Sequence, residues 1–165
     1  MKKYSLIWVI VLFMFFGCAT YQTPWTATPK SASVSNKFFK ATITPGSYDH
    51  EKGGYKAFLI AVTNKTNEYI TVDWNKSLFI ENDKTNGGFI YSGVLYSLKD
   101  APKPPEFVAP GKTLKKFIMP MVKMKKEGQS WRHLPLNAGV NGVLLAVKVG
   151  KQEVTEKITL TLTKN

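Results

Sequence analysis

The chain has one cysteine and one arginine among its 165 residues. Because a disulfide needs two cysteines, none can form within the chain, and in an oxidising compartment the fold must rest on its apolar core. Sites that read phosphate groups commonly use several arginines, since a guanidinium forms two parallel hydrogen bonds whereas a lysine ammonium acts as a point charge. The scarcity of arginine therefore argues against a dedicated phosphate-reading site.

Residues for catalysis or metal binding are also few. The two histidines are His50 and His133. His50 lies between Asp49 and Glu51, but adjacent side chains in an extended loop point in different directions and rarely converge on one ion. No nucleophile-elbow, zinc-protease or phosphate-loop motif occurs, and Asp73 has no assignable partner for acid catalysis. We therefore predict that the protein is not an enzyme and has no catalytic residue, metal site or cofactor.

The longest apolar run lies at the N-terminus. Two lysines precede the stretch Leu6–Phe16, which ends at Gly17-Cys18. Its eleven residues are fewer than the roughly 20 that a membrane-spanning helix needs. A positive start, an apolar centre and a small residue before the cut are typical of a secretory signal. We predict a signal peptide over residues 1–17, cleaved before Cys18. An ordinary cleaved signal without lipidation and an uncleaved signal anchor are the alternatives.

The residues Phe15-Phe16-Gly17-Cys18 resemble a bacterial lipobox, in which small and aliphatic residues precede an obligatory cysteine. Gly17 and Cys18 fit that pattern, whereas Phe15 and Phe16 stand where a leucine and a small residue are usual. The resemblance implies that the Cys18 sulfur carries a diacylglycerol and that the new amino group is acylated. Two or more acyl chains hold a protein firmly, because each buried methylene contributes about 0.8 kcal/mol. Since Ala19 and not aspartate follows, the resemblance implies an outer-membrane location facing the periplasm.

Residues 18–36 are predicted to form a flexible tether, because they are rich in Thr, Ser, Ala and Pro and have no sustained apolar periodicity. Within this segment, Trp25 is expected either at the lipid interface or docked on the domain. The rest of the chain, residues 37–165, is predicted to be one domain of ordinary size.

From residue 37 onward, apolar and polar residues alternate in short runs separated by turn residues, and no comparable window has helical spacing. Prolines 102, 104, 105 and 110 predict a loop without regular pairing. Seven or eight short strands at this spacing predict an all-β fold, an antiparallel β-sandwich. The predicted strands are 37–44, 55–63, 69–74, 78–80, 89–95, 113–119, 142–149 and 153–162.

The segment Val72-Asp73-Trp74-Asn75 and the turn Pro110-Gly111 resemble the small immunoglobulin-like sandwiches of bacterial lipoproteins. The resemblance covers about residues 37–163 and implies that Trp74 is a core aromatic. The cysteine pair of true immunoglobulin domains is absent. Burial of one large aromatic contributes roughly 2–3 kcal/mol, so several such residues can replace the missing bridge.

The chain carries a formal charge of +12, and loss of two lysines with the leader leaves 21 basic and 11 acidic residues, a charge of +10. Such a charge attracts polyanions and anionic lipid head groups. A candidate anion-binding region spans residues 112–132, where basic residues interleave with methionines and a tryptophan against the single Glu127. The favoured alternative is a solvated strand edge that lysines protect against pairing, followed by a mobile loop. The basic residues are Lys112, Lys115, Lys116, Lys123, Lys125, Lys126 and Arg132.

Three functions are compatible with these features. The first is a non-enzymatic envelope lipoprotein that binds another envelope protein or stabilises an assembly. The second is a polyanion, envelope-glycan or lipid head-group binding module acting through residues 112–132. The third is a hydrolase with a site assembled from dispersed loop residues. The expected partners are the membrane, through the lipid anchor, an envelope protein and an anionic glycan or lipid; nucleic acid is not expected for an exported protein.

Overall fold

The computed structural model describes residues 25–48, 53–91 and 93–165. The predicted signal peptide, the predicted cleavage site at Gly17, the predicted lipidation site Cys18 and His50 lie outside the described residues.

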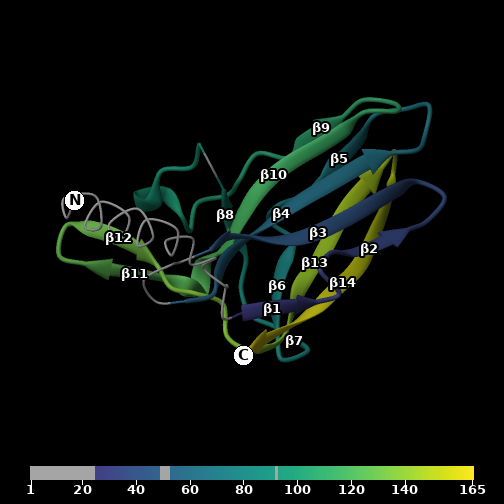
Figure 1. The fold of residues 1–165 in the computed structure, drawn as a ribbon. Coiled ribbons are helices and arrows are strands. Elements are labelled where there is room, and N and C mark those ends of the chain that lie inside the picture. Colours follow the sequence, from purple (N-terminus) through teal and green to yellow (C-terminus); the bar gives the residue numbers. More distant parts are fainter. Residues whose placement is uncertain (1–24, 49–52, 92) are drawn as a thin grey trace, which may run out of the picture.

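Two antiparallel sheets pack together as a sandwich, which confirms the predicted all-β fold (Figure 1). In the first sheet, β5 and β6 both pair with β13, and β7 pairs with β6. The remaining order is β1 (Trp25–Thr28), β14 (Gln152–Lys164), β13 (Gly139–Val149), β5 (Ile70–Val72) and β9 (Glu106–Val108), with β6 covering Leu78–Glu81 and β7 Lys84–Thr85. The second sheet has the order β2 (Ala32–Ser35), β3 (Phe39–Tyr48), β4 (Tyr55–Asn64), β10 (Thr113–Pro120) and β8 (Phe89–Tyr91).

A third, two-stranded sheet projects from one end of the sandwich (Figure 1). It is the hairpin of β11 (Met124–Glu127) and β12 (Ser130–His133), with Gly128 at positive φ in its turn. Among the described residues, two short 3-10 helices accompany the strands, η2 (Tyr96–Leu98) and η3 (Met121–Lys123).

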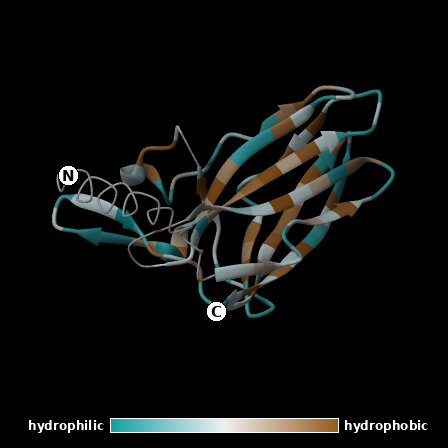
Figure 2. Ribbon diagram, in the orientation of Figure 1, coloured by the Kyte–Doolittle hydropathy of each residue, from teal (hydrophilic) through white to brown (hydrophobic). Residues whose placement is uncertain are grey.

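The core follows from the alternation of side chains along each strand, visible as hydrophobic and hydrophilic bands in Figure 2. The inward-facing residues of β3 and β4 are fully buried: Phe39, Ala41, Ile43, Phe58, Ile60 and Val62. Because both sheets turn one apolar face toward the other, these side chains meet in one cluster. The largest fully buried side chains include Trp74, Phe39, Phe58, Phe79 and Phe89.

The β13–β14 hairpin is the longest paired region of the described residues, and both of its strands were predicted from the sequence. Its register runs from Gly139 opposite Leu162 to Val149 opposite Gln152. Gly150, with φ of 57°, makes the turn, which suits a residue without a side chain. In β14, Ile158, Leu160 and Leu162 are buried in the core, and Val154 is partly buried against it.

The predicted tether extends too far along the chain. Trp25–Thr28 pairs with β14, and Ala32–Ser35 pairs with β3, so residues 25–35 belong to the folded domain. Trp25 packs against the core, which settles its position in favour of docking on the domain. These four-residue edge strands contain few apolar side chains, so backbone pairing with a longer neighbour, and not their own pattern, stabilises them.

Two predicted loops contain further strands. Three residues between Pro105 and Pro110 form β9, which pairs with β5 and ends the first sheet as the structure describes it. At a sheet edge, prolines are tolerated because their missing backbone N–H is not needed for a hydrogen bond to a further strand. The predicted mobile loop after β10 is the β11–β12 hairpin. With β1, β2 and the two-residue β7, these additions bring the strands of the described residues to 14, against the seven or eight predicted.

Candidate functional site

Two of the seven basic residues predicted to bind anions lie inside the fold. Lys116 is on the inward face of β10 between Leu114 and Ile118, and it forms an ion pair with Glu106 of β9. Only 17% of the Lys116 side chain and 28% of the Glu106 side chain are exposed. The pair therefore joins the second sheet to the first along the side of the sandwich where β9 ends the first sheet and Thr113–Phe117 of β10 borders the second. We call this the open side.

The Lys116–Glu106 pair is part of a larger polar and aromatic cluster. The indole N–H of Trp74 donates a hydrogen bond of 2.9 Å to Glu106 Oε2. The Lys116 ammonium lies 3.9 Å from the ring centroid of Tyr91, and the Trp74 and Tyr91 rings are 5.4 Å apart. Burial, with the Glu106 carboxylate as a second cause, raises the pKa of the Tyr91 phenol, so this ring stays neutral.

Lys123 is the second of the predicted basic residues that lie inside the fold. Its ammonium is 2.5 Å from Glu81 Oε1, with 11% and 12% of the two side chains exposed. The side-chain amides of Asn86 and Asn137 each donate a hydrogen bond of 2.9 Å to the Glu81 carboxylate. Glu81 therefore holds η3, the β7 turn and the segment before β13 together, and Lys123 is not presented to an external anion.

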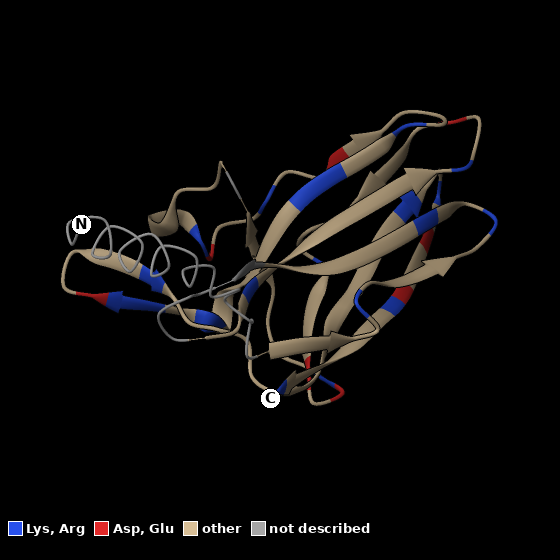
Figure 3. Ribbon diagram, in the orientation of Figure 1, with Lys and Arg blue, Asp and Glu red and all other residues tan. Residues whose placement is uncertain are grey.

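The other five predicted anion-binding residues occupy two separate places (Figure 3). Lys112 and Lys115 are exposed at the start of β10 on the sandwich. Lys125, Lys126 and Arg132 lie on the β11–β12 hairpin, where Glu127 is 3.9 Å from the Lys125 ammonium and 3.5 Å from the Arg132 guanidinium. The structure thus divides the predicted region instead of bringing its seven residues to one anion site.

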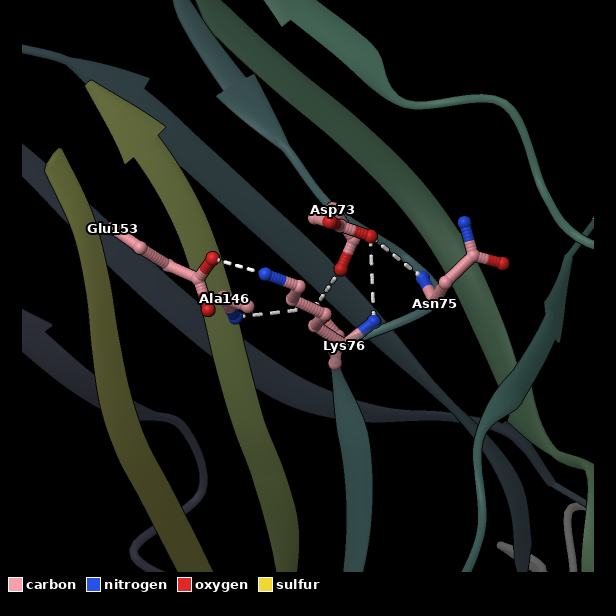
Figure 4. Close-up of polar contacts among 6 residues, drawn as sticks. Asp73, Asn75, Lys76, Ala146 and Glu153 are labelled. Carbon is pink, nitrogen blue, oxygen red and sulfur yellow. Dashed lines mark hydrogen bonds and ion pairs between the residues drawn. The ribbon is translucent and has the colours of Figure 1, made fainter. Parts of the chain in front are cut away.

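Asp73 has a structural role at the end of β5 (Figure 4). Its Oδ1 accepts hydrogen bonds from the backbone N–H groups of Asn75 at 3.0 Å and Lys76 at 3.3 Å. The Ser77 hydroxyl donates to the Asp73 carbonyl at 2.7 Å and accepts from the Ala146 N–H at 3.1 Å. This side-chain turn explains the local chain direction.

The His133 ring contacts the Tyr96 ring in a tilted arrangement, with the ring centroids 5.5 Å apart and an interplanar angle of 59°. Both imidazole nitrogens are buried and lack a hydrogen-bond partner in the described part of the chain. Burial, and to a lesser degree Lys56, lowers the pKa of the imidazole. No group of three or more metal-ligating side chains occurs among residues 25–48, 53–91 and 93–165.

A buried lysine, Lys103, lies outside the sequence predictions. It lines a pocket of about 240 Å³ together with Trp74 and Met121. Its ammonium donates a hydrogen bond of 2.8 Å to the Lys99 carbonyl, and burial lowers its pKa. Asn75 fixes its backbone by two hydrogen bonds of 2.7 Å, so the Lys103 loop is bound to the end of β5.

Exposed aromatic residues occur on both outer faces of the sandwich, on or beside strands β5, β9 and β10. Phe107 of β9 is 70% exposed and lies opposite Thr71 on the outer face of the first sheet. Tyr69, directly before β5, is also exposed. Phe117 of β10 is exposed on the outer face of the second sheet, where its ring covers Gly46.

Three comparisons with known proteins found no match: a scan against protein-family models, a search of curated proteins and a search of solved structures. In the portion of the chain that the structure describes, no helix is long and apolar enough to cross a membrane.

Proposed function

We propose that this protein is a lipid-anchored envelope protein whose β-sandwich is a non-enzymatic module that binds another protein or stabilises an assembly. The N-terminal lipobox-like segment supports the anchor, and the open side of the sandwich supports protein binding. The observation that carries the second part is a free strand edge on β10 flanked by exposed aromatic residues.

The free edge follows from the hydrogen-bond pattern. Asn64 N–H donates to the Lys112 carbonyl at 2.9 Å, and the β4–β10 register continues from this pair. In an antiparallel ladder, hydrogen-bonded pairs alternate along the strand, so Thr113, Lys115 and Phe117 direct their backbone groups away from β4. Within the described residues β8 pairs with β10 only from Ile118 onward.

Such an edge can accept a strand from a partner, with backbone hydrogen bonds supplying affinity and side-chain contacts supplying specificity. Phe107, Tyr69 and Phe117 border this side, and aromatic residues are enriched in protein interfaces. Lysines on the edge oppose pairing with another copy and favour an acidic partner segment.

Photo-crosslinking in intact envelopes tests the proposal. A crosslinking amino acid at Lys115 is expected to capture a defined partner, whereas the same group at Lys157, on the outer face of β14, is the matched control. The Phe107→Asp substitution is expected to abolish capture from Lys115. Equal capture from both positions, or none from Lys115, would contradict a partner site at this edge.

Polyanion binding is the second proposal, supported by the exposed lysines. Because Lys123 is paired inside the fold, the informative variants are Lys125→Ala with Lys126→Ala and, separately, Lys112→Ala with Lys115→Ala. Retention of envelope glycan at low salt by both double variants would exclude this function, since exposed charges act most strongly there.

A further inference from the structure

Exposed aliphatic side chains concentrate at the end of the sandwich that bears the β11–β12 hairpin. Leu95 is 67% exposed and Leu98 is 54% exposed, and Val122 in η3 is exposed as well. The η2 helix between Leu95 and Lys99 has no buried residue. These side chains therefore contribute little to the core, and their exposure costs free energy unless something covers them.

Side-chain contacts place these loops beside one another. The Tyr96 ring of η2 contacts the His133 ring of β12 in a tilted arrangement, and the Lys103 ammonium lies 3.7 Å from the Met121 sulfur of η3. The loop of residues 93–104, η3 and the hairpin thus form one surface, which we name the hairpin end. It comprises residues 93–104 and 121–134.

The hairpin end is basic. Four of its basic residues lie at the surface, because Lys103 and Lys123 are buried, and they stand against two acidic ones, Asp100 and Glu127. Both acidic side chains lie beside basic neighbours, Asp100 at 2.5 Å from Lys99 and Glu127 at 3.5 Å from Arg132. Lys126 is exposed on the hairpin, whose basic positions are blue in Figure 3. Together with Leu95, Leu98 and Val122, the surface therefore combines positive charge with aliphatic side chains.

The described chain begins at the base of this end. Gly54 lies between Trp25 and Pro135: a Cβ added there would be 3.3 Å from the indole and 3.2 Å from the proline ring. Pro135 follows Leu134, whose N–H donates to the Lys123 carbonyl of η3 at 2.8 Å. The chain upstream of Trp25 therefore joins the domain next to the hairpin end.

The position of Cys18 then limits the distance to the bilayer. Six residues lie between Cys18 and Trp25, and the seven Cα–Cα steps that join the two residues span at most about 25 Å when fully extended. If Cys18 carries the lipid, as the proposed function holds, the end of the domain at Trp25 cannot move far from the head groups.

We infer that the hairpin end rests on an anionic lipid surface. Leu95, Leu98 and Val122 enter the head-group region, and Lys125 and Lys126 lie against lipid phosphates. Aliphatic side chains combined with lysines are the composition that binds peripheral surfaces to acidic bilayers. This orientation leaves the edge of β10 at Thr113–Phe117 available to a protein partner, and it rests on the proposed lipid anchor.

Site-directed fluorescence on the full acylated chain tests the orientation. Cys18 is the only native cysteine, and a thioether there would not react, so Leu98→Cys introduces one reactive thiol for an environment-sensitive dye. Asn67→Cys is the matched control, because Asn67 is exposed in the turn between β4 and β5, at the opposite end of the sandwich (Figure 1). The proteins are reconstituted into vesicles of phosphatidylethanolamine and phosphatidylglycerol that contain nitroxide-labelled lipid.

The dye at position 98 is expected to shift its emission to the blue and to be quenched by the nitroxide lipid, while the dye at position 67 is not. Adding Lys125→Ala and Lys126→Ala lowers the ratio of docked to undocked protein on the order of 20- to 30-fold, from about five-fold for each lysine near an anionic surface. The Lys112→Ala with Lys115→Ala variant leaves this ratio unchanged. Equal, unquenched emission at both positions overturns the inference.

Two further outcomes separate this inference from the proposed function. A blue shift at position 98 that disappears when the protein is diluted in lipid would indicate contact between copies and would overturn the inference. Mass spectrometry of the mature N-terminus reports acylation independently. If Cys18 carries no lipid, the proposed anchor is wrong. Vesicle flotation of the unacylated chain then tests whether the hairpin end binds lipid by itself, and failure to float with anionic vesicles overturns the inference.

Discussion

The Glu106→Gln substitution tests the Lys116–Glu106 ion pair that joins the two sheets. Gln retains an oxygen that can accept the hydrogen bond of the Trp74 indole but removes the negative charge beside Lys116. Removal of one partner from a fully buried ion pair costs about 3–5 kcal/mol. Because both side chains are partly exposed, we expect a smaller loss, about 2–3 kcal/mol in the free energy of unfolding.

The assay is urea unfolding at neutral pH, with thermal unfolding as a second measure. A loss of this size lowers the Tm by about 6–12 °C for a domain of this length. The Glu106→Gln with Lys116→Met double variant leaves no unpaired charge, so we expect it to be more stable than the sum of the single effects implies.

The matched control is Glu153→Gln. Glu153 pairs with Lys76 on the outer face of the first sheet, where 45% and 56% of the two side chains are exposed. Because solvent screens this pair, its loss is expected to leave the unfolding midpoint nearly unchanged. Equal effects of Glu106→Gln and Glu153→Gln, or strict additivity of the double variant, would refute the reasoning for the inner pair.

Three further predictions concern the fold. In the Gly142→Ala variant, the new Cβ would lie 2.1 Å from the Ile158 carbonyl oxygen. Thermal unfolding is therefore expected to show a loss of about 1–3 kcal/mol in the free energy of unfolding. An unchanged Tm would mean that the β13–β14 backbones separate easily. Because the folded state lowers the pKa of His133, the unfolded chain binds its proton more readily, and stability is expected to fall as the pH drops below about 6.5. The His133→Gln variant should flatten that part of the pH profile in urea unfolding; identical profiles would contradict the assignment. A chain beginning at residue 37 loses β1 and β2 and is expected to be less stable by at least about 3 kcal/mol than one beginning at residue 25, and equal stability would restore the predicted tether.

Alternation of side chains predicted the long strands because each has enough inward residues to define a face. β14 alternates from Val154 to Leu162, and β13 has Val143, Leu145 and Val147 buried at period two, with a Gly-Lys turn between the two strands. By contrast, β11 reads Met-Lys-Lys-Glu and has no apolar alternation. Its pairing with β12 depends on backbone hydrogen bonds and on the Gly128 turn, which single-chain periodicity does not detect.

The same limit applies to the charged residues. Lys116 stands between Leu114 and Ile118 in the inward phase of its strand, a signal that a buried ion pair was possible. Its partner Glu106 could not be found, because β9 lies between prolines and was predicted to be a loop. A run of lysines therefore predicted one basic surface, whereas strand direction divides these lysines between the interior, the β10 edge and the hairpin.

The central claim is the lipid on Cys18, and metabolic labelling with radioactive palmitate tests it most directly. The account predicts label on the mature chain, none on the Cys18→Ser variant, and recovery of the labelled protein with the membrane fraction. An unlabelled mature chain that is released from the cell would contradict it.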